Sequence, residues 1–353
     1  MGKSSYPPNL RESIFYERIA DYKVKCTLCE RRCEIPPGNL GFCKTRININ
    51  GKIYTLVYGA LSAVESRPIE IKPFFHYWPG STALTFSTWS CNFNCPWCQN
   101  WSLSKAVPDI DCSGSYYPPE DIVKLAVRKG DEGLCSSFQE PTLLTDWNID
   151  LFKIGHAQGL YACYVSNGYM TIEALKVLRE SGMDGLKIDI KGDPEVYEKF
   201  CGGIDPEKVW RNVREASKMG FHVELVNLVI TGVNDDEDCL KSIIERSLKE
   251  AGPETPLHFT RYYPAYKFNN PATKVEILEK AYEIAKKAGV LYPYVGNVPG
   301  HKYENTYCPN CHEPLIKRYG FRVLRYIITE NNKCPKCGFH INMRGRCVKK
   351  VFF

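Results

Sequence analysis

The chain has 353 residues, of which 44% are hydrophobic and 24% are charged, and its formal net charge at pH 7 is +6. These proportions are ordinary for a globular protein, so they exclude a disordered or fibrous chain. No uncharged apolar run of about 18 residues occurs, and the N-terminal stretch is polar and charged, which excludes a membrane span and an export signal. We therefore expect a cytoplasmic protein with no membrane partner.

The cysteines indicate metal binding. Eleven of the 17 cysteines fall into three clusters at metal-ligand spacing, and without an export signal disulfide bonds are the poorer explanation. The other six are scattered, and we expect them to act as small buried side chains. These six are Cys112, Cys135, Cys163, Cys201, Cys239 and Cys347.

The first predicted domain, residues 1–66, carries the first cluster. Its four cysteines stand within 18 residues, and proline and glycine residues before the last of them supply the turns that would bring them together. They are Cys26, Cys29, Cys33 and Cys43. Zinc and an auxiliary iron-sulfur cluster both fit four soft ligands, and the spacing does not choose between them. A hairpin is predicted directly afterwards, around Asn50-Gly51.

The second predicted domain, residues 67–300, alternates short apolar strands with helical patterns. We predict strands at residues 82–89, 134–138, 161–165, 185–190, 222–230 and 257–262, and helices at 119–129, 147–158, 172–181, 206–219, 235–251 and 273–288. Six such units predict an α/β fold, a partial (β/α)6 barrel. In barrels of this kind, the functional groups lie at the C-terminal ends of the strands.

The second cysteine cluster follows the first predicted strand. Cys91, Cys95 and Cys98 form a CxxxCxxC loop, which supplies three thiolates to one [4Fe-4S] cluster and leaves the fourth iron open to bind a ligand. A zinc site borrowing Cys112 is the alternative, because no fourth cysteine stands in the loop itself. The sequence of residues 87–100 resembles that of the radical S-adenosylmethionine (SAM) enzymes.

Polar residues at the later strand ends suit a zwitterionic, adenosine-bearing ligand. Glu140 can accept hydrogen bonds from an ammonium group, and Lys191 can pair with a carboxylate. Ser166 or Asn167 can bind ribose or carboxylate oxygens. With Asp189, which shares a strand face with Lys191, these five residues are the predicted cofactor-binding set.

Each of these residues also has a purely structural interpretation. Glu140 can cap the start of a helix, and Asn167-Gly168 can form a left-handed turn. The polar face of the fourth strand is formed by Lys187, Asp189 and Lys191. This face could be solvated, although inner barrel strands have no solvated face. At the end of the sixth strand, the aromatic and basic stretch 261–267 either lines a substrate opening or packs the edge of the barrel.

The third predicted domain, residues 301–353, is a basic zinc ribbon. Its two CxxC knuckles predict a four-cysteine zinc site: Cys308, Cys311, Cys334 and Cys337. A hairpin is predicted between the knuckles, and His312 and His340 are not needed as ligands. Residues 308–353 hold ten Lys or Arg against two Glu, which suits an acidic partner or nucleic acid.

Several segments together resemble the radical SAM component of the AmmeMemoRadiSam system, a branch of the proteins similar to pyruvate formate-lyase-activating enzyme. The resemblance covers residues 20–340 and is carried by residues 26–43, 90–100, 137–142, 258–267 and 296–308. It implies that Cys91, Cys95 and Cys98 ligate the cluster and that Glu140 binds the SAM amino group. Asp189 and Lys191 match the Asp-x-Lys of the activating enzymes.

The sequence departs from the activating enzymes at two places. Their Gly-Gly-Glu-Pro is here Phe138-Gln139-Glu140-Pro141, so the glutamate is kept but the close glycine approach is not. Their acidic residue two positions before the Asn-Gly turn is here Val165, which puts the monovalent-cation site of some of them in doubt.

The resemblance implies reductive chemistry. SAM is cleaved to methionine and a 5′-deoxyadenosyl radical, which takes a hydrogen atom from a substrate, and an electron donor protein is required. The activating enzymes act on a protein partner, so we expect one here. The alternatives are a radical SAM enzyme acting on a small metabolite, and an RNA-binding or RNA-modifying iron-sulfur protein. The nucleic-acid alternative is less favoured, because the net positive charge is confined to the C-terminal region.

Overall fold

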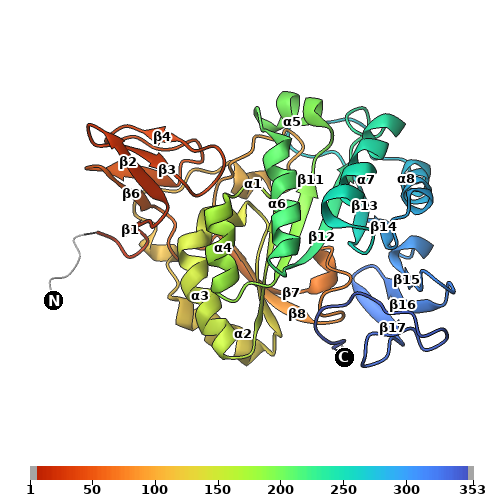
Figure 1. The fold of residues 1–353 in the computed structure, drawn as a ribbon. Coiled ribbons are helices and arrows are strands. Elements are labelled where there is room, and N and C mark those ends of the chain that lie inside the picture. Colours follow the sequence, from red (N-terminus) through yellow and green to blue (C-terminus); the bar gives the residue numbers. More distant parts are fainter. Residues whose placement is uncertain (1–5, 349–353) are drawn as a thin grey trace. The chain divides into compact units, whose positions relative to one another are not determined.

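The computed structural model describes residues 6–348 (Figure 1). By internal contacts the chain divides into two compact units. Unit 1 consists of the chain up to residue 66 with residues 83–94 and 98–184, and unit 2 consists of residues 67–82, 95–97 and 185 onward. This division follows packing within the chain. The three functional domains divided near residues 66 and 300 stay a prediction.

Unit 1 begins with two small antiparallel sheets. Their strands, in sheet order, are β1 (Arg11–Glu12), β6 (Lys52–Thr55) and β5 (Arg46–Ile49), and then β2 (Tyr16–Ala20), β3 (Lys23–Cys26) and β4 (Glu34–Ile35). The predicted hairpin is confirmed as β5 and β6, joined by Asn50 at φ 51° and Gly51 at φ 79°. Positive φ at both turn residues is the geometry that suits the twist of a two-residue hairpin.

The rest of unit 1 is a strand–helix alternation around three parallel strands. These are β8 (Thr82–Ser87), β9 (Gly133–Ser136) and β10 (Tyr161–Ser166), paired in that order. Its helices are α1 (Trp101–Ser104), α2 (Pro119–Lys129), α3 (Thr145–Ala157) and α4 (Ile172–Glu180), with short 3-10 helices at Ser113–Ser115 and Pro141–Leu144. Every residue of β9 is buried, as expected for a parallel strand covered on both faces.

Unit 2 continues the same alternation with four parallel strands. They are β11 (Gly185–Ile190), β12 (His222–Val229), β13 (Leu257–Arg261) and β14 (Pro293–Gly296). Its helices are α5 (Pro194–Cys201), α6 (Pro206–Lys218), α7 (Glu237–Ala251) and α8 (Val275–Ala288), and β7 (Ala63–Pro68) and the 3-10 helix Ile69–Ile71 lead into it. All six predicted strands are present, so the α/β partial-barrel class is confirmed. Strands β7 and β14 and helices α1 and α5 were not predicted.

The C-terminal ribbon is part of unit 2 and packs against its other elements. Its strands are β15 (Thr306–Tyr307), β16 (Pro314–Tyr319) and β17 (Arg322–Tyr326), which follow a 3-10 helix at Lys302–Glu304, and β16 and β17 form the predicted hairpin. Leu315 and Ile316 of the ribbon share one hydrophobic cluster with Phe75 and with Tyr294 of β14. The ribbon is therefore anchored on the last strand of the barrel and on the segment that precedes the first.

A buried polar network ties the same segment to β12. Glu224, fully buried, accepts hydrogen bonds from the backbone N–H groups of Phe75 and His76, at 3.0 and 2.7 Å. The imidazoles of His222 and His258 lie 2.9 and 2.7 Å from the same carboxylate. Burial alone would raise the pKa of Glu224, but its hydrogen bonds to the two histidines lower that pKa well below its usual range. The network fixes residues 67–82 before the chain enters β8.

Glu70, in the same segment, is a buried carboxyl with an incomplete set of partners. It is 2% exposed, and Oε1 accepts from the N–H of Gly80 at 2.7 Å while Oε2 has no hydrogen-bond partner. Burial raises its pKa from 4.5 to about 7, against the opposing charge of Arg318. The folded chain therefore keeps a proton on Glu70 that the unfolded chain releases.

We predict that Glu70→Gln stabilises the protein at pH 8 and has little effect at pH 4.5. The contribution of Glu70 is fully present below the unfolded pKa and is lost as the pH rises through about 7, because ionisation of the buried carboxyl then opposes folding. The expected gain at pH 8 is about 2–3 kcal/mol. Thermal unfolding of both proteins at the two pH values measures it, and an equal difference at both would contradict the assignment.

No helix among residues 6–348 is long and apolar enough to cross a membrane.

Candidate functional site

The loop after β8 places two of the three cluster cysteines in unit 1. The Cys91 thiol accepts a hydrogen bond from the backbone N–H of Phe93 at 3.3 Å, and the Cys98 thiol lies 3.1 Å from the hydroxyl of Ser104 in α1. Ser90 adopts φ 73° and donates from Oγ to the carbonyl of Cys43 at 2.6 Å. Donors directed at sulfur stabilise a thiolate, so both cysteines are prepared to act as metal ligands.

Asn92 connects this loop to the end of β10. Asn167 donates from its side-chain amide to Oδ1 of Asn92 at 2.7 Å, and the same oxygen lies 3.9 Å from the Cys91 thiol. Asn167 also accepts from the N–H of Tyr169 at 3.0 Å, with Gly168 at φ 74°. The structural turn interpretation of Asn167-Gly168 is therefore realised, and the turn also brings Asn167 to the cysteine loop.

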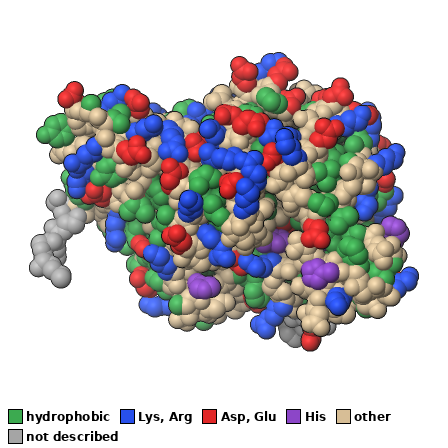
Figure 2. Space-filling view, viewed as in Figure 1, with side chains coloured by type: hydrophobic (Ala, Val, Ile, Leu, Met, Phe, Trp, Pro, Cys, Tyr) green, Lys and Arg blue, Asp and Glu red, His purple; other side chains and the backbone are tan. Residues whose placement is uncertain are grey.

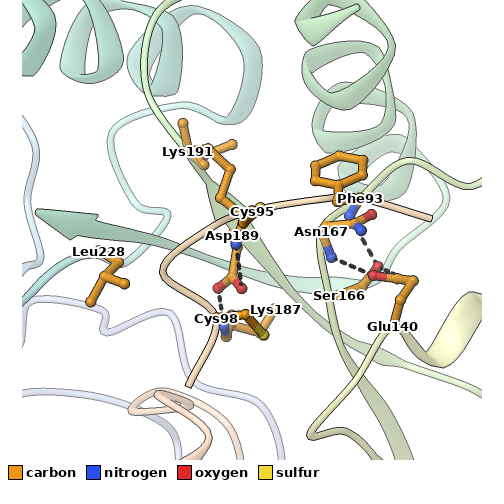
Figure 3. Close-up of polar contacts among 12 residues, drawn as sticks. Phe93, Cys95, Cys98, Glu140, Ser166, Asn167, Lys187, Asp189, Lys191 and Leu228 are labelled. Atoms are coloured by element: carbon orange, nitrogen blue, oxygen red, sulfur yellow. Dashed lines mark hydrogen bonds and ion pairs between the residues drawn. The ribbon is translucent and has the colours of Figure 1, made fainter. Parts of the chain in front are cut away.

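Glu140 is held in place by four donors at the end of β9. Its carboxylate accepts hydrogen bonds from Ser166 Oγ at 2.8 Å, from the N–H of Asn167 at 2.9 Å, and from the N–H and hydroxyl of Thr142 (Figure 3). The bond from Thr142 N–H caps the following 3-10 helix, so the capping interpretation is realised as well. Burial raises the pKa of Glu140, and these hydrogen bonds act in the opposite direction. Glu140, Ser166 and Asn167 thus form one oriented group.

The two residues before Glu140 have unusual features, one in its backbone and one in its side chain. Phe138 adopts φ 70°, so the backbone is left-handed at this position even though the residue has a bulky side chain. Gln139 is buried, and both polar atoms of its side-chain amide lack a hydrogen-bond partner. An unpaired buried amide costs about 1–3 kcal/mol, which a bound polar ligand would offset.

Unit 2 contains the remaining predicted residues. Asp189 forms ion pairs with Lys187 and with Lys191, the latter at 3.1 Å (Figure 3). Burial would raise the pKa of Asp189, but the two lysines lower it to about 2. Burial would lower the pKa of Lys191, whereas Asp189 and the nearby thiols of Cys95 and Cys201 raise it above its usual range. Lys191 is thus a fixed cation close to the Cys95 thiol, which lies 3.7 Å from the thiol of Cys201.

The ribbon cysteines form a compact four-sulfur site. Among residues 6–348 they are the one group of potential metal ligands whose ligand atoms all lie within 4.8 Å of one another: Cys308, Cys311, Cys334 and Cys337. The sulfur pairs 308–337 and 311–334 are 3.5 and 3.7 Å apart, close to the roughly 3.8 Å that a tetrahedral Zn–S distance of about 2.3 Å requires. His312 and His340 are exposed and outside this group.

The N-terminal cysteines surround a cavity instead. Cys26, Cys29, Cys33 and Cys43 all line it, and three of them are buried. Backbone N–H groups of Leu28, Arg31 and Phe42 are directed at the sulfurs of the first three. The free space among these side chains is small, with room for about one water molecule.

Comparison with known proteins places this geometry in a family. Residues 87–245 match the family model of the radical SAM superfamily. Over 336 residues, which are 95% of the chain, it is 40% identical to an uncharacterized protein of Methanocaldococcus jannaschii, and the match covers 99% of that protein. Residues 87–245 of this chain therefore form a radical SAM superfamily domain.

Two further similarities to radical SAM proteins cover only part of the chain. A probable GTP 3′,8-cyclase of Pyrobaculum aerophilum is 28% identical over 163 residues, which are 44% of this chain and 50% of that one. The solved structure of a domain of pyruvate-formate lyase-activating enzyme from Bacteroides vulgatus aligns with a TM-score of 0.41 and 23% identity, covering 47% of this chain and 99% of that one.

The residues present fit the cluster and the SAM that radical SAM chemistry requires. The loop offers three thiols and no fourth, and the oriented carboxylate of Glu140 can accept hydrogen bonds from an ammonium group. The unpaired amide of Gln139 offers both a donor and an acceptor to a polar ligand. Asn92, Gln139 and Cys201 were not predicted as site residues. Asn92 could have been found from its position within the cysteine motif, and Gln139 from its position next to Glu140. Nothing in the sequence places Cys201 beside Cys95.

Proposed function

We propose that this chain is a radical SAM enzyme of the activating-enzyme-like branch, of the AmmeMemoRadiSam type, and that its hydrogen donor is a partner protein. The radical SAM superfamily domain, together with a loop that offers three cysteines rather than four, carries the reductive cleavage of SAM. When bound, the cluster and SAM supply a 5′-deoxyadenosyl radical that abstracts hydrogen from the substrate.

In this proposal the chain's own residues bind and orient SAM. Cys91, Cys95 and Cys98 hold the cluster, and Glu140, with its orientation set by Ser166 and Asn167, accepts hydrogen bonds from the SAM amino group. Cationic Lys191 and its partner Asp189 contribute charge and hydrogen bonds to the remaining polar groups of SAM. The side-chain amide of Gln139, which has no hydrogen-bond partner in the protein, forms hydrogen bonds with SAM. Glu140, Ser166 and Asn167 are buried, so they exclude water from the amino group that they bind.

The end of β13 supports a protein partner. Tyr263 and Lys267 are exposed there, and the guanidinium of Arg261 lies 5.0 Å from the ring centre of Tyr263. Tyr262 is buried instead and donates from its hydroxyl to the carbonyl of Phe268, so it packs the edge of the barrel. Exposed aromatic and basic side chains of this kind are common where proteins bind one another.

A small-molecule substrate is the second candidate. Its support is the similarity to GTP 3′,8-cyclases, which act on the nucleotide GTP. A nucleic-acid substrate has less support, because basic and acidic side chains are interspersed over the face shown in Figure 2.

The formation of 5′-deoxyadenosine separates these candidates. Reconstituted, reduced protein is incubated with SAM and with the macromolecular or the low-molecular-weight fraction of a cell extract, and the Cys91→Ala variant serves as the blank. Stimulation by the macromolecular fraction that protease treatment removes supports a protein partner. Stimulation by the low-molecular-weight fraction, or by GTP alone, would overturn it in favour of a small molecule.

Glu140→Gln tests the SAM-binding role. Loss of a charge-assisted hydrogen bond costs about 1.5–3 kcal/mol, so the KM for SAM should rise by about 10–100-fold. Gln retains one acceptor oxygen for Ser166 and Thr142, but its amide nitrogen cannot accept from the N–H of Asn167, so the melting temperature should fall by a few degrees while the chain stays folded. Glu180→Gln, at an exposed position of unit 1, is the matched control. An unchanged KM with an intact fold would assign Glu140 to helix capping alone.

A further inference from the structure

The two four-cysteine sites differ in how closely their sulfurs approach. The ribbon thiols lie together at the spacing of a single tetrahedral ion. Within residues 6–348, the N-terminal thiols do not all lie within 4.8 Å of one another as the ribbon thiols do. They line a shared cavity instead. Thiolates that bind four different irons of one cluster are farther apart than thiolates that share one zinc ion. The wider arrangement therefore favours a polynuclear cluster.

The lining of this cavity also contains buried polar atoms without partners. Arg46 is 1% exposed, and its Nε has no hydrogen-bond partner, although its Nη2 donates to the carboxylate of Asp146 at 2.7 Å and to the carbonyl of Leu143 at 3.1 Å. The amide nitrogen of Asn92, fully buried, is directed at the Cys29 thiol and has no other partner. Both groups line the cavity with the cysteines. A buried cation and an amide donor are what a negatively charged thiolate-bound cluster requires.

We propose that Cys26, Cys29, Cys33 and Cys43 hold a second, closed [4Fe-4S] cluster that passes electrons to the SAM-binding cluster. Four cysteine ligands leave no iron open, so this cluster carries electrons and binds no substrate. The inference rests on the proposed function for the identity of the electron acceptor, but not for the existence of the second cluster.

Two contacts within unit 1 give the electron a short path. Asn92 lies between the sites, since its amide nitrogen is directed at Cys29 and its Oδ1 is 3.9 Å from the Cys91 thiol. The hydroxyl of Ser90, adjacent to Cys91, donates to the carbonyl of Cys43 at 2.6 Å. One electron moves from the second cluster, which is oxidised from 1+ to 2+, to the SAM-binding cluster, which is reduced from 2+ to 1+. No bond or proton is transferred, and an external donor protein of the flavodoxin or ferredoxin class reduces the second cluster again.

Metal content tests the second cluster without reference to activity. The full chain is reconstituted anaerobically as wild type, as the triple variant Cys91→Ala, Cys95→Ala and Cys98→Ala, and as the double variant Cys33→Ala and Cys43→Ala. Wild type should contain about eight iron atoms and one zinc ion, and each multiple variant about four iron atoms. Cys112→Ala, a partly buried thiol of unit 1 outside every cluster, is the matched control and should match wild type.

Electron paramagnetic resonance then distinguishes the two clusters. The reduced triple variant should give a signal that SAM does not change, because no iron is open, whereas SAM should shift the signal of the double variant. Fully reduced wild type should show broadening from magnetic coupling between neighbouring clusters, beyond the sum of the two variants.

Two outcomes would overturn the proposal. A triple variant with almost no iron and about two zinc ions would make the N-terminal site a zinc site, and if that variant does not fold, about four iron atoms and two zinc ions in wild type would show the same. Wild-type spectra that equal the simple sum of the variants would remove the electron-transfer role. About eight iron atoms with no 5′-deoxyadenosine formed would instead contradict the proposed function and leave the second cluster intact.

Discussion

Cys95→Ala should abolish the cleavage of SAM while the chain stays folded. Its thiol is one of only three that the loop offers, so its loss leaves the cluster with two protein ligands. We expect 5′-deoxyadenosine formation to fall by at least about a thousandfold, because without the cluster no electron reaches SAM. The measurement is single-turnover product formation with dithionite-reduced protein, together with iron content.

The matched control is Cys201→Ala, whose thiol lies 3.7 Å from that of Cys95. Cys201 is buried at the end of α5 and is not part of the motif, so its variant should keep the cluster iron and most of the product. Product formation by Cys95→Ala at the wild-type rate would disprove the cluster assignment.

Replacing Cys337 should release zinc and destabilise the ribbon. Cys337 is exposed, unlike Cys308 and Cys334, so the Cys337→Ala variant removes a ligand without creating a cavity in the core. Structural zinc sites contribute strongly to folding, and we expect the loss to be about 3–4 kcal/mol, or about 10 °C in melting temperature. Because the ribbon packs on β14 and Phe75, the barrel should also unfold at the lower temperature.

Zinc content and thermal unfolding of Cys337→Ala test this, with Cys347→Ala as the control in the same region. Cys347 lies outside the four-sulfur group, so its variant should keep both zinc and stability. If Cys337→Ala lost SAM cleavage while it kept its zinc and its melting temperature, the ribbon would have a catalytic role that the zinc assignment does not include.

The sequence predicted the strands that position the site, because buried parallel strands form short apolar runs bounded by helical patterns. Residues 185–190 were predicted with the bounds of β11, and the other five strands differ by at most two residues at either end. β14 was missed, since Pro293 and Gly296 limit it to four residues and weaken the strand pattern.

The contacts that orient the site could not be predicted in the same way. Asn92 and Asn167 are 75 residues apart, and their hydrogen bond exists only once β8 and β10 have folded into one sheet with β9 between them. The network around Glu224 depends on the segment 67–82, whose residues show no periodic pattern. Periodicity identifies elements, whereas pairing of polar side chains across the chain depends on packing.

The left-handed backbone of Phe138 has a consequence for protein engineering. A non-glycine residue in this conformation costs about 1–2 kcal/mol, and the chain accepts this cost directly beside Glu140. Glycine at this position would relieve the strain, and it would also remove a partly buried aromatic side chain two residues before Glu140. Position 138 is therefore a place where the chain could be stabilised without changing any of the proposed ligands.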